Sequence, residues 1–171
     1  MHSYGVENPE TIVVLETKFG AIEIELFNDT PLHRANFIHL TKRKFFDETC
    51  FHRVDPGFVI QGGNSDRDEV RKLKNKIGVF KLPQEFRKRL KHEYGSVAMA
   101  RSYKNNPEKS SNPYEFYIVM NKKGTPHLDN EHTVFGRVIR GMDVATKISN
   151  LKTDGGEWPV IDVYVKASVI K

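Results

Sequence analysis

Residues 51–63 read FHRVDPGFVIQGG, and two short runs of aromatic and branched side chains flank the Pro56-Gly57 pair in this stretch. Such a pair is typical of a tight turn, so the stretch predicts two extended segments joined by that turn. Arg53 lies in the first segment and Gln61 in the second. An apolar surface that carries one guanidinium and one neutral amide suits a ligand that is mostly apolar but has carbonyl groups and an amide nitrogen. A proline-containing peptide is a ligand of this kind.

The segments around this stretch predict many short strands and few helices. Alternating patterns predict a hairpin and four later strands, over 11–16, 21–27, 95–100, 114–120, 132–138 and 160–170. Near-helical spacing of apolar residues predicts helices over 31–42 and 142–148, with His33 and Arg34 of the first helix turned toward water. The charged segment 66–76 fits either a short exposed helix or a mobile loop. This pattern favours an all-β barrel.

Length and composition indicate one globular domain. The chain has 171 residues, of which 38% are hydrophobic and 29% charged, and it contains no apolar run of the roughly 20 residues that span a bilayer. The polar residues 1–10 predict a flexible N-terminal arm without an export signal, although a signal removed earlier would leave no trace. The single cysteine, Cys50, excludes an internal disulfide. We therefore expect a cytoplasmic protein that is not integral to a membrane.

The stretch at 51–63 closely resembles the signature of the cyclophilins, the cyclosporin-binding family of peptidyl-prolyl cis-trans isomerases. The resemblance extends from about Thr11 to the C-terminus, so residues 11–171 are interpreted as one cyclophilin-like isomerase domain. It implies a closed eight-stranded antiparallel β-barrel capped by two α-helices. It also implies a monomeric enzyme that needs no cofactor or metal, acts on proline-containing peptides and unfolded proteins, and assists folding.

Arg53 is the best candidate for the catalytic group. The X-Pro bond rotates slowly because it has partial double-bond character, and a catalyst must stabilise the twisted state, in which the proline nitrogen can accept a hydrogen bond. Arginine is always charged and has several donors. On the residues alone, Arg53 also fits a purely structural pairing with a carboxylate such as Glu115. The resemblance favours catalysis, because Arg53 falls on the family's catalytic arginine, and Gln61 would then hold a substrate carbonyl.

The resemblance also implies the walls of the site. The proline pocket would be lined by apolar side chains and one imidazole, namely Phe58, Val59, Tyr117, Leu128 and His132, although period-2 reasoning alone assigns most of these to the core. The bound peptide would pair with the backbone of Met99, Ala100 and Arg101. Glu115, Phe116 and His127 complete the expected substrate-binding set.

Several residues depart from the family's common pattern. Glu115 replaces glutamine, Tyr117 replaces phenylalanine and Arg101 replaces asparagine. His127 stands where cyclosporin-sensitive members have tryptophan, so we expect weak cyclosporin binding. The effect of Glu115 is open: the carboxylate would either position the guanidinium of Arg53 or partly neutralise it. The charged segment 66–76 replaces a loop rich in glycine and threonine.

The excess positive charge is concentrated in one segment. Residues 66–92 contain ten Lys or Arg against four Asp or Glu, whereas the whole chain has a net charge of +5. Because no aromatic residues alternate with these charges, a solvated basic face is favoured over a nucleic-acid site. The histidines lack metal-ligand spacing, and Cys50 is expected to be buried and inert. The alternative function is a proline-peptide binding module or scaffold with weak turnover. Association of this module with nucleic acid through the basic segment stays open.

Overall fold

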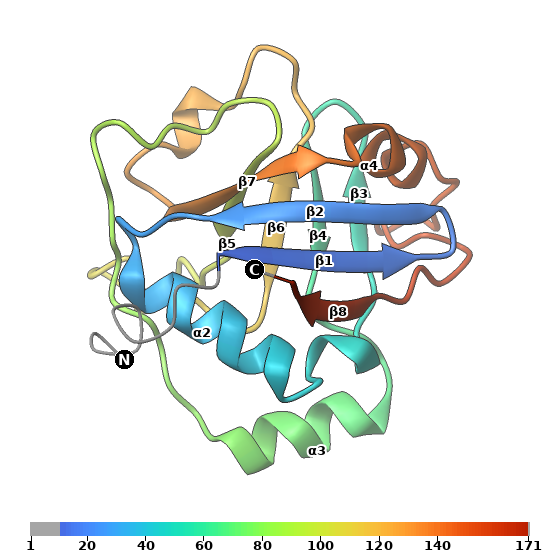
Figure 1. The fold of residues 1–171 in the computed structure, drawn as a ribbon, viewed down its shortest axis with the longest axis horizontal. Coiled ribbons are helices and arrows are strands. Elements are labelled where there is room, and N and C mark those ends of the chain that lie inside the picture. Colours follow the sequence, from blue (N-terminus) through green and yellow to red (C-terminus); the bar gives the residue numbers. More distant parts are fainter. Residues whose placement is uncertain (1–10, 171) are drawn as a thin grey trace.

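A computed structural model describes residues 11–170, and the predicted arm at 1–10 lies outside these residues. Eight antiparallel strands form one curved sheet in the order β3-β4-β6-β5-β7-β2-β1-β8 (Figure 1). The strands are β1 (Ile12–Thr17), β2 (Gly20–Leu26), β3 (Arg53–Asp55), β4 (Val59–Gly62), β5 (Ser96–Met99), β6 (Phe116–Val119), β7 (Val134–Arg140) and β8 (Lys166–Val169). The predicted hairpins and the all-β class are confirmed, and the predicted last strand is shortened to β8.

The sheet is an open half-barrel, so the expectation of a closed barrel was wrong. β3 and β8 are the two ends of the strand order and share no ladder. Between them Cys50 makes isolated bridges to Asn64 and Tyr164. The connection 150–165 runs beside the β3 segment, where the Phe51 N–H donates to the Val163 carbonyl. Turns in this connection leave isolated bonds where a closed barrel would need a continuous ladder.

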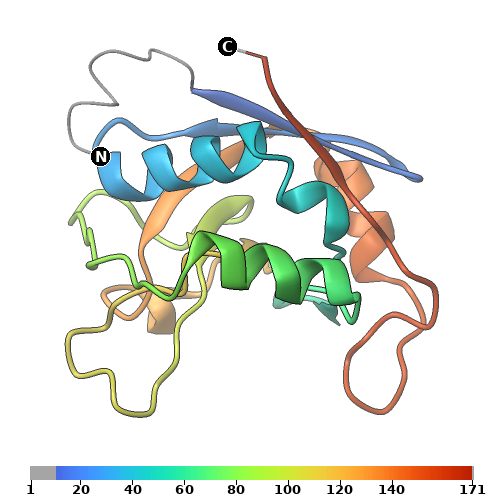
Figure 2. The same ribbon diagram turned by 90° about the horizontal axis from the view of Figure 1, so that it is seen from below.

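Within residues 11–170, three α-helices accompany the sheet, rather than the two expected: α2 (Pro31–Lys42), α3 (Asp68–Ile77) and α4 (Met142–Ser149). Both predicted helices, α2 and α4, are confirmed. α2 packs against β7 and β8, whereas α4 packs against β2, β3 and β4 (Figures 1 and 2). The main core lies between these elements, and Phe37 of α2 meets Phe116 of β6 edge-on at 5.3 Å between ring centroids.

The buried face of α2 is wider than its pattern predicts. His33 and Arg34 are 0% and 1% exposed, so their expected placement in water was wrong. The His33 Nδ1 lies 2.7 Å from a Glu85 carboxylate oxygen, and its Nε2 lies 2.8 Å from the Ser111 hydroxyl. Hydrogen-bond partners from distant segments make this burial of polar groups tolerable.

The charged segment after β4 forms the helix α3, which settles the choice between helix and loop. Its first turn is acidic and its last turn basic, which suits the helix dipole, and it ends at Gly78 with a φ of 103°. Val70 is 2% exposed, and Leu73 and Ile77 pack beside it against the main core. α3 runs along the outside of the molecule below α2 (Figure 1).

Candidate active site

The hairpin of β3 and β4 brings Arg53 and Gln61 directly opposite each other. Gln61 in turn lies opposite Tyr117 of β6, and Tyr117 lies opposite Ala98 of β5. Residues at matching register on neighbouring strands point to the same face of a sheet. The sheet topology therefore places a guanidinium, an amide and an aromatic ring in one row.

This row lies beside a second apolar cluster, separate from the main core. The cluster is formed by buried side chains from four strands and the segment after β6, with Phe58 packed against it: Val59, Ala98, Tyr117, Val119, Leu128 and Val134. Strand residues alternate between the two faces of a sheet, so both faces of this half-barrel carry apolar side chains. Periodicity alone cannot tell a groove of this kind from a core.

A cavity of about 400 Å³ opens at this cluster. Ten of its lining residues are in the predicted site: Arg53, Phe58, Val59, Gln61, Ala100, Arg101, Glu115, Tyr117, Leu128 and His132. The sequence analysis missed Ser102, Tyr103 and Asn112, which also line it. These three belong to the polar loop 101–113, whose path over the cavity depends on distant contacts and gives no local signal.

Three predicted substrate-binding residues lie elsewhere. The side chains of Met99 and Phe116 are 0% exposed in the main core, because they alternate with Ala98 and Tyr117 along their strands. The Met99 backbone is also engaged, since its N–H donates to the Thr133 carbonyl. His127 is exposed and stacks on Phe58, with ring centroids 5.8 Å apart, outside the cavity lining.

Arg53 is paired with carboxylates, as one reading of the sequence had it, but the partners are Glu157 and Asp55 and not the expected Glu115. Its Nε donates to a Glu157 oxygen at 2.5 Å, and its Nη2 lies 3.6 Å from an Asp55 oxygen. Its guanidinium carbon lies 5.8 Å from the centroid of the Phe58 ring. The hydrogen bond from Arg53 lowers the pKa of Glu157, which is therefore ionised at neutral pH. Glu157 has a left-handed backbone, with a φ of 66°.

Glu115 interacts with Gln61. The Gln61 Nε2 donates to a Glu115 carboxylate oxygen at 3.2 Å. This bond leaves the amide oxygen of Gln61 as an acceptor and restrains the orientation of the side chain. The carboxylate thus orients the amide, a role that the sequence analysis did not consider.

The hydroxyl of Tyr117 points into the protein. It lies 2.8 Å from the Nε2 of His92, whose Nδ1 lies 2.8 Å from an Asp129 oxygen. A carboxylate only accepts, so the His92 Nδ1 carries the proton and its Nε2 accepts from Tyr117. Burial lowers the pKa of His92 and raises that of Tyr117, which keeps both groups neutral. The hydroxyl that distinguishes Tyr117 from the family's phenylalanine is therefore hydrogen-bonded to His92 beneath the cavity, and the Tyr117 ring forms part of the cavity wall.

Metal-dependent and thiol chemistry are not supported by the side chains of residues 11–170. Within the described residues 11–170, no cluster of three His, Cys, Asp or Glu side chains is arranged to hold a metal ion. Cys50 is a free, buried thiol, as predicted, and burial raises its pKa to about 12. None of the helices within these residues is long and apolar enough to cross a membrane.

An antiparallel half-barrel with this groove is a cyclophilin-like architecture, and the comparisons agree. A crystal structure of a cyclophilin type peptidyl-prolyl cis-trans isomerase from Cryptosporidium parvum, determined in the presence of the dipeptide Ala-Pro, superposes with a TM-score of 0.79 and 25% sequence identity. The match covers 94% of this chain and 99% of that one.

Sequence comparison gives the family. The sequence model of the cyclophilin type peptidyl-prolyl cis-trans isomerase/CLD family matches residues 12–169. A peptidyl-prolyl cis-trans isomerase of Acinetobacter baylyi is 36% identical over 145 residues, covering 84% of this chain and 74% of that protein. The isomerase CYP18-2 of Arabidopsis thaliana is 33% identical over 155 residues, covering 90% and 89%. The chain belongs to the cyclophilin-type peptidyl-prolyl cis-trans isomerases, whose general role is to assist protein folding.

Proposed function

We propose that this isomerase binds the proline of its substrate against Phe58, Leu128 and Tyr117, and that Arg53 donates to the proline nitrogen as the X-Pro bond twists. The observation that carries this assignment is the direct opposition of Arg53 and Gln61 at the edge of the 400 Å³ cavity. A fixed donor favours the twisted state, because only there does the nitrogen become an acceptor. Gln61, oriented by Glu115, holds a carbonyl of the substrate.

The substrate class is a proline-containing peptide or an unfolded chain. Ala100 offers no free backbone group, because its N–H donates to the Glu115 carbonyl and its carbonyl accepts from the Asn112 N–H. Within residues 11–170, no backbone hydrogen bond engages Arg101. We therefore assign backbone pairing with an extended peptide to Arg101, rather than to all three residues from Met99 to Arg101.

The test is NMR exchange spectroscopy on a short X-Pro peptide. We expect wild-type protein to accelerate cis-trans exchange, and Arg53→Ala to lower kcat/KM by about 100-fold or more, as for loss of a transition-state donor. Arg71→Ala is the matched control, because Arg71 lies on α3, outside the cavity lining, and pairs with Asp68 one turn away. If Arg53→Ala and Arg71→Ala behave alike, the role of Arg53 is refuted.

A second candidate is a binding module with weak turnover. Asp55 and Glu157 both approach the Arg53 guanidinium, and two carboxylates would weaken its attraction for the substrate. Peptide binding in NMR titrations without accelerated exchange would establish this alternative in place of catalysis.

Cyclosporin is proposed to bind weakly. His127 stacks on Phe58 with its plane tilted by only 16°, and an imidazole presents a smaller apolar surface to the ligand than an indole. Inhibition of isomerase activity by cyclosporin measures this directly. Nanomolar potency would contradict it, and His127→Trp should increase the potency.

The basic segment 66–92 is proposed to be a solvated face rather than a nucleic-acid site. Several of its cations are paired within the protein: Arg67 with Glu48, Arg71 with Asp68 and Arg89 with Asp29. Salt-dependent retention on a polyanion column, with competition by RNA, would overturn this proposal. We also propose a cytoplasmic monomer, which light scattering and imaging of a tagged chain would test.

A further inference from the structure

Tyr103 is an aromatic residue at the mouth of the cavity to which the proposed mechanism gives no role. It is 65% exposed and belongs to the loop 101–113, yet it lines the same cavity as Arg53, Leu128 and His132. Exposed tyrosines on long loops are usually unrestrained. Tyr103 instead has partners for its hydroxyl and for its ring.

The hydroxyl of Tyr103 is held by His132. The His132 Nδ1 lies 3.0 Å from the Met99 carbonyl, which only accepts, so Nδ1 carries the proton. Nε2 is then the acceptor for the Tyr103 hydroxyl at 2.6 Å. Burial lowers the pKa of His132 to about 4, so this arrangement persists at neutral pH.

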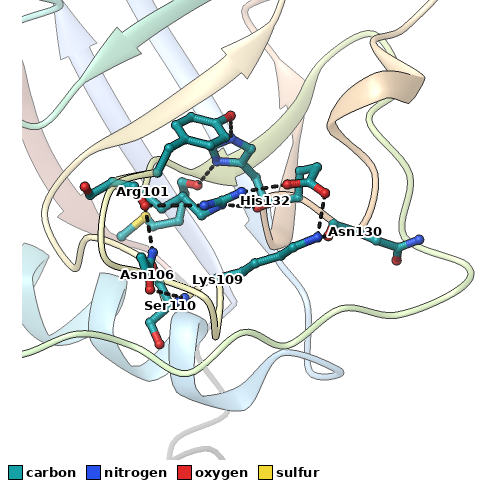
Figure 3. A network of polar contacts seen from close by, with 10 residues as sticks. Arg101, Asn106, Lys109, Ser110, Asn130 and His132 are labelled. Carbon is teal, nitrogen blue, oxygen red and sulfur yellow. Dashed lines mark hydrogen bonds and ion pairs between the residues drawn. The ribbon is translucent and has the colours of Figure 1, made fainter.

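The ring of Tyr103 rests on Arg101. The Arg101 guanidinium carbon lies 4.1 Å from the ring centroid, a cation–π distance. Arg101 is itself fixed: its side chain is 4% exposed, its Nε donates to the Glu131 carbonyl at 2.5 Å, and its Nη2 lies 2.6 Å from the Glu131 carboxylate. Lys109 reaches the other oxygen of that carboxylate at 2.5 Å (Figure 3).

The loop that carries Tyr103 is closed on itself. The Asn106 side chain donates to the carbonyls of Ser102 and Ser110 at 2.8 and 2.9 Å and accepts from the Ser110 N–H (Figure 3). Asn106 is 4% exposed, so these bonds are shielded from water. The loop thus presents an aromatic ring that is held by contacts within the protein.

We propose that Tyr103 determines substrate specificity, favouring an aromatic or aliphatic residue next to the proline over a charged one. Cavity-lining contacts place the ring beside the proline pocket, and ordering a ring that is already held costs little entropy on binding. The two cations near this ring, Arg53 and Arg101, are already paired with Glu157 and Glu131. An acidic residue next to the substrate proline would therefore meet cations whose charge is already balanced. This inference rests on the proposed isomerase function.

The test compares kcat/KM for two peptide series by NMR exchange, one varying the residue before proline and one varying the residue after it among Phe, Leu, Glu and Lys. We expect wild type to favour Phe or Leu over Glu by about three- to ten-fold on one side of the proline, the usual worth of an aromatic contact. Tyr103→Ala should bring this ratio close to one. Tyr103→Phe should keep it, because the ring remains on Arg101.

Lys104→Ala is the matched control, since Lys104 is an exposed neighbour in the same loop outside the cavity lining. It should leave the ratio at the wild-type value. An unchanged ratio in Tyr103→Ala, with wild type active, would overturn the role of Tyr103 alone. Failure of wild type to accelerate any peptide would instead overturn the isomerase function on which the role depends.

Discussion

The contact between Arg53 and Glu157 fixes the position of the guanidinium that we propose as the catalytic group. Glu157→Gln keeps an acceptor for the Arg53 Nε but removes its charge, so Arg53 gains freedom to leave the 2.5 Å contact. We expect kcat/KM to fall by about three- to ten-fold, as for loss of positioning of a catalytic group. Exchange spectroscopy on an X-Pro peptide measures the change, with the exposed surface substitution Glu108→Gln as control. A rise in kcat/KM would show that Glu157 restrains catalysis by neutralising the guanidinium.

The Tyr117 hydroxyl should matter for stability. Tyr117→Phe leaves the buried Nε2 of His92 without its donor, because His92 is only 3% exposed. We expect the free energy of unfolding to fall by about 1–3 kcal/mol, the cost of an unsatisfied buried polar group. Urea unfolding measures it, and Tyr94→Phe, at a less buried tyrosine, should stay within about 0.5 kcal/mol. Equal stability of Tyr117→Phe and wild type would mean that water replaces the hydroxyl.

At the scale of elements, α3 should contribute to stability through one face. Val70→Ala removes two methyl groups from a site that is 2% exposed and should lower the free energy of unfolding by about 1–3 kcal/mol. Lys72→Ala on the exposed face should change it by less than about 0.5 kcal/mol. Urea unfolding of both variants tests this difference. Similar values for the two would indicate that α3 is loosely attached.

Elements with strong local patterns were predictable from the sequence. The strands around Pro56-Gly57 and the helix at 31–42 follow from period and turn chemistry, and the resemblance added the opposed pair Arg53 and Gln61. Contacts between side chains that are far apart in the sequence were not predictable. Glu157 is 104 residues from Arg53, and Tyr103 reaches His132 across a loop. The burial of His33 and the open sheet edge likewise depend on contacts that no local pattern encodes.

For the whole molecule, buried neutral histidine makes stability depend on pH. His132 has a folded pKa of about 4, lowered by burial, whereas an unfolded histidine titrates near 6.5. Between these values the unfolded chain binds more protons, so stability is full above about pH 6.5 and is lost as the pH falls toward 4. We expect the free energy of unfolding to be about 2 kcal/mol lower at pH 5 than at pH 7.

Urea unfolding at the two pH values measures this difference. His132→Asn removes the titrating group and should reduce the difference, while His39, His52 and His92, whose pKa values are also lowered by burial, contribute to the remainder. Equal stability at pH 5 and pH 7 would contradict the neutral, buried state of His132.

At the open edge of the half-barrel, the carboxylate that holds Arg53 comes from a turn and not from a strand ladder. Arg53 lies on β3, a terminal strand, and its counter-ion comes from the connection 150–165, which forms no ladder with that strand. Glu157 adopts its left-handed backbone within this connection, whose later residues Val163 and Val165 are buried in the main core. On the proposed mechanism, substitutions in the exposed turn at 154–156 beside Glu157 would therefore tune turnover, whereas substitutions at Val163 and Val165 would also lower stability.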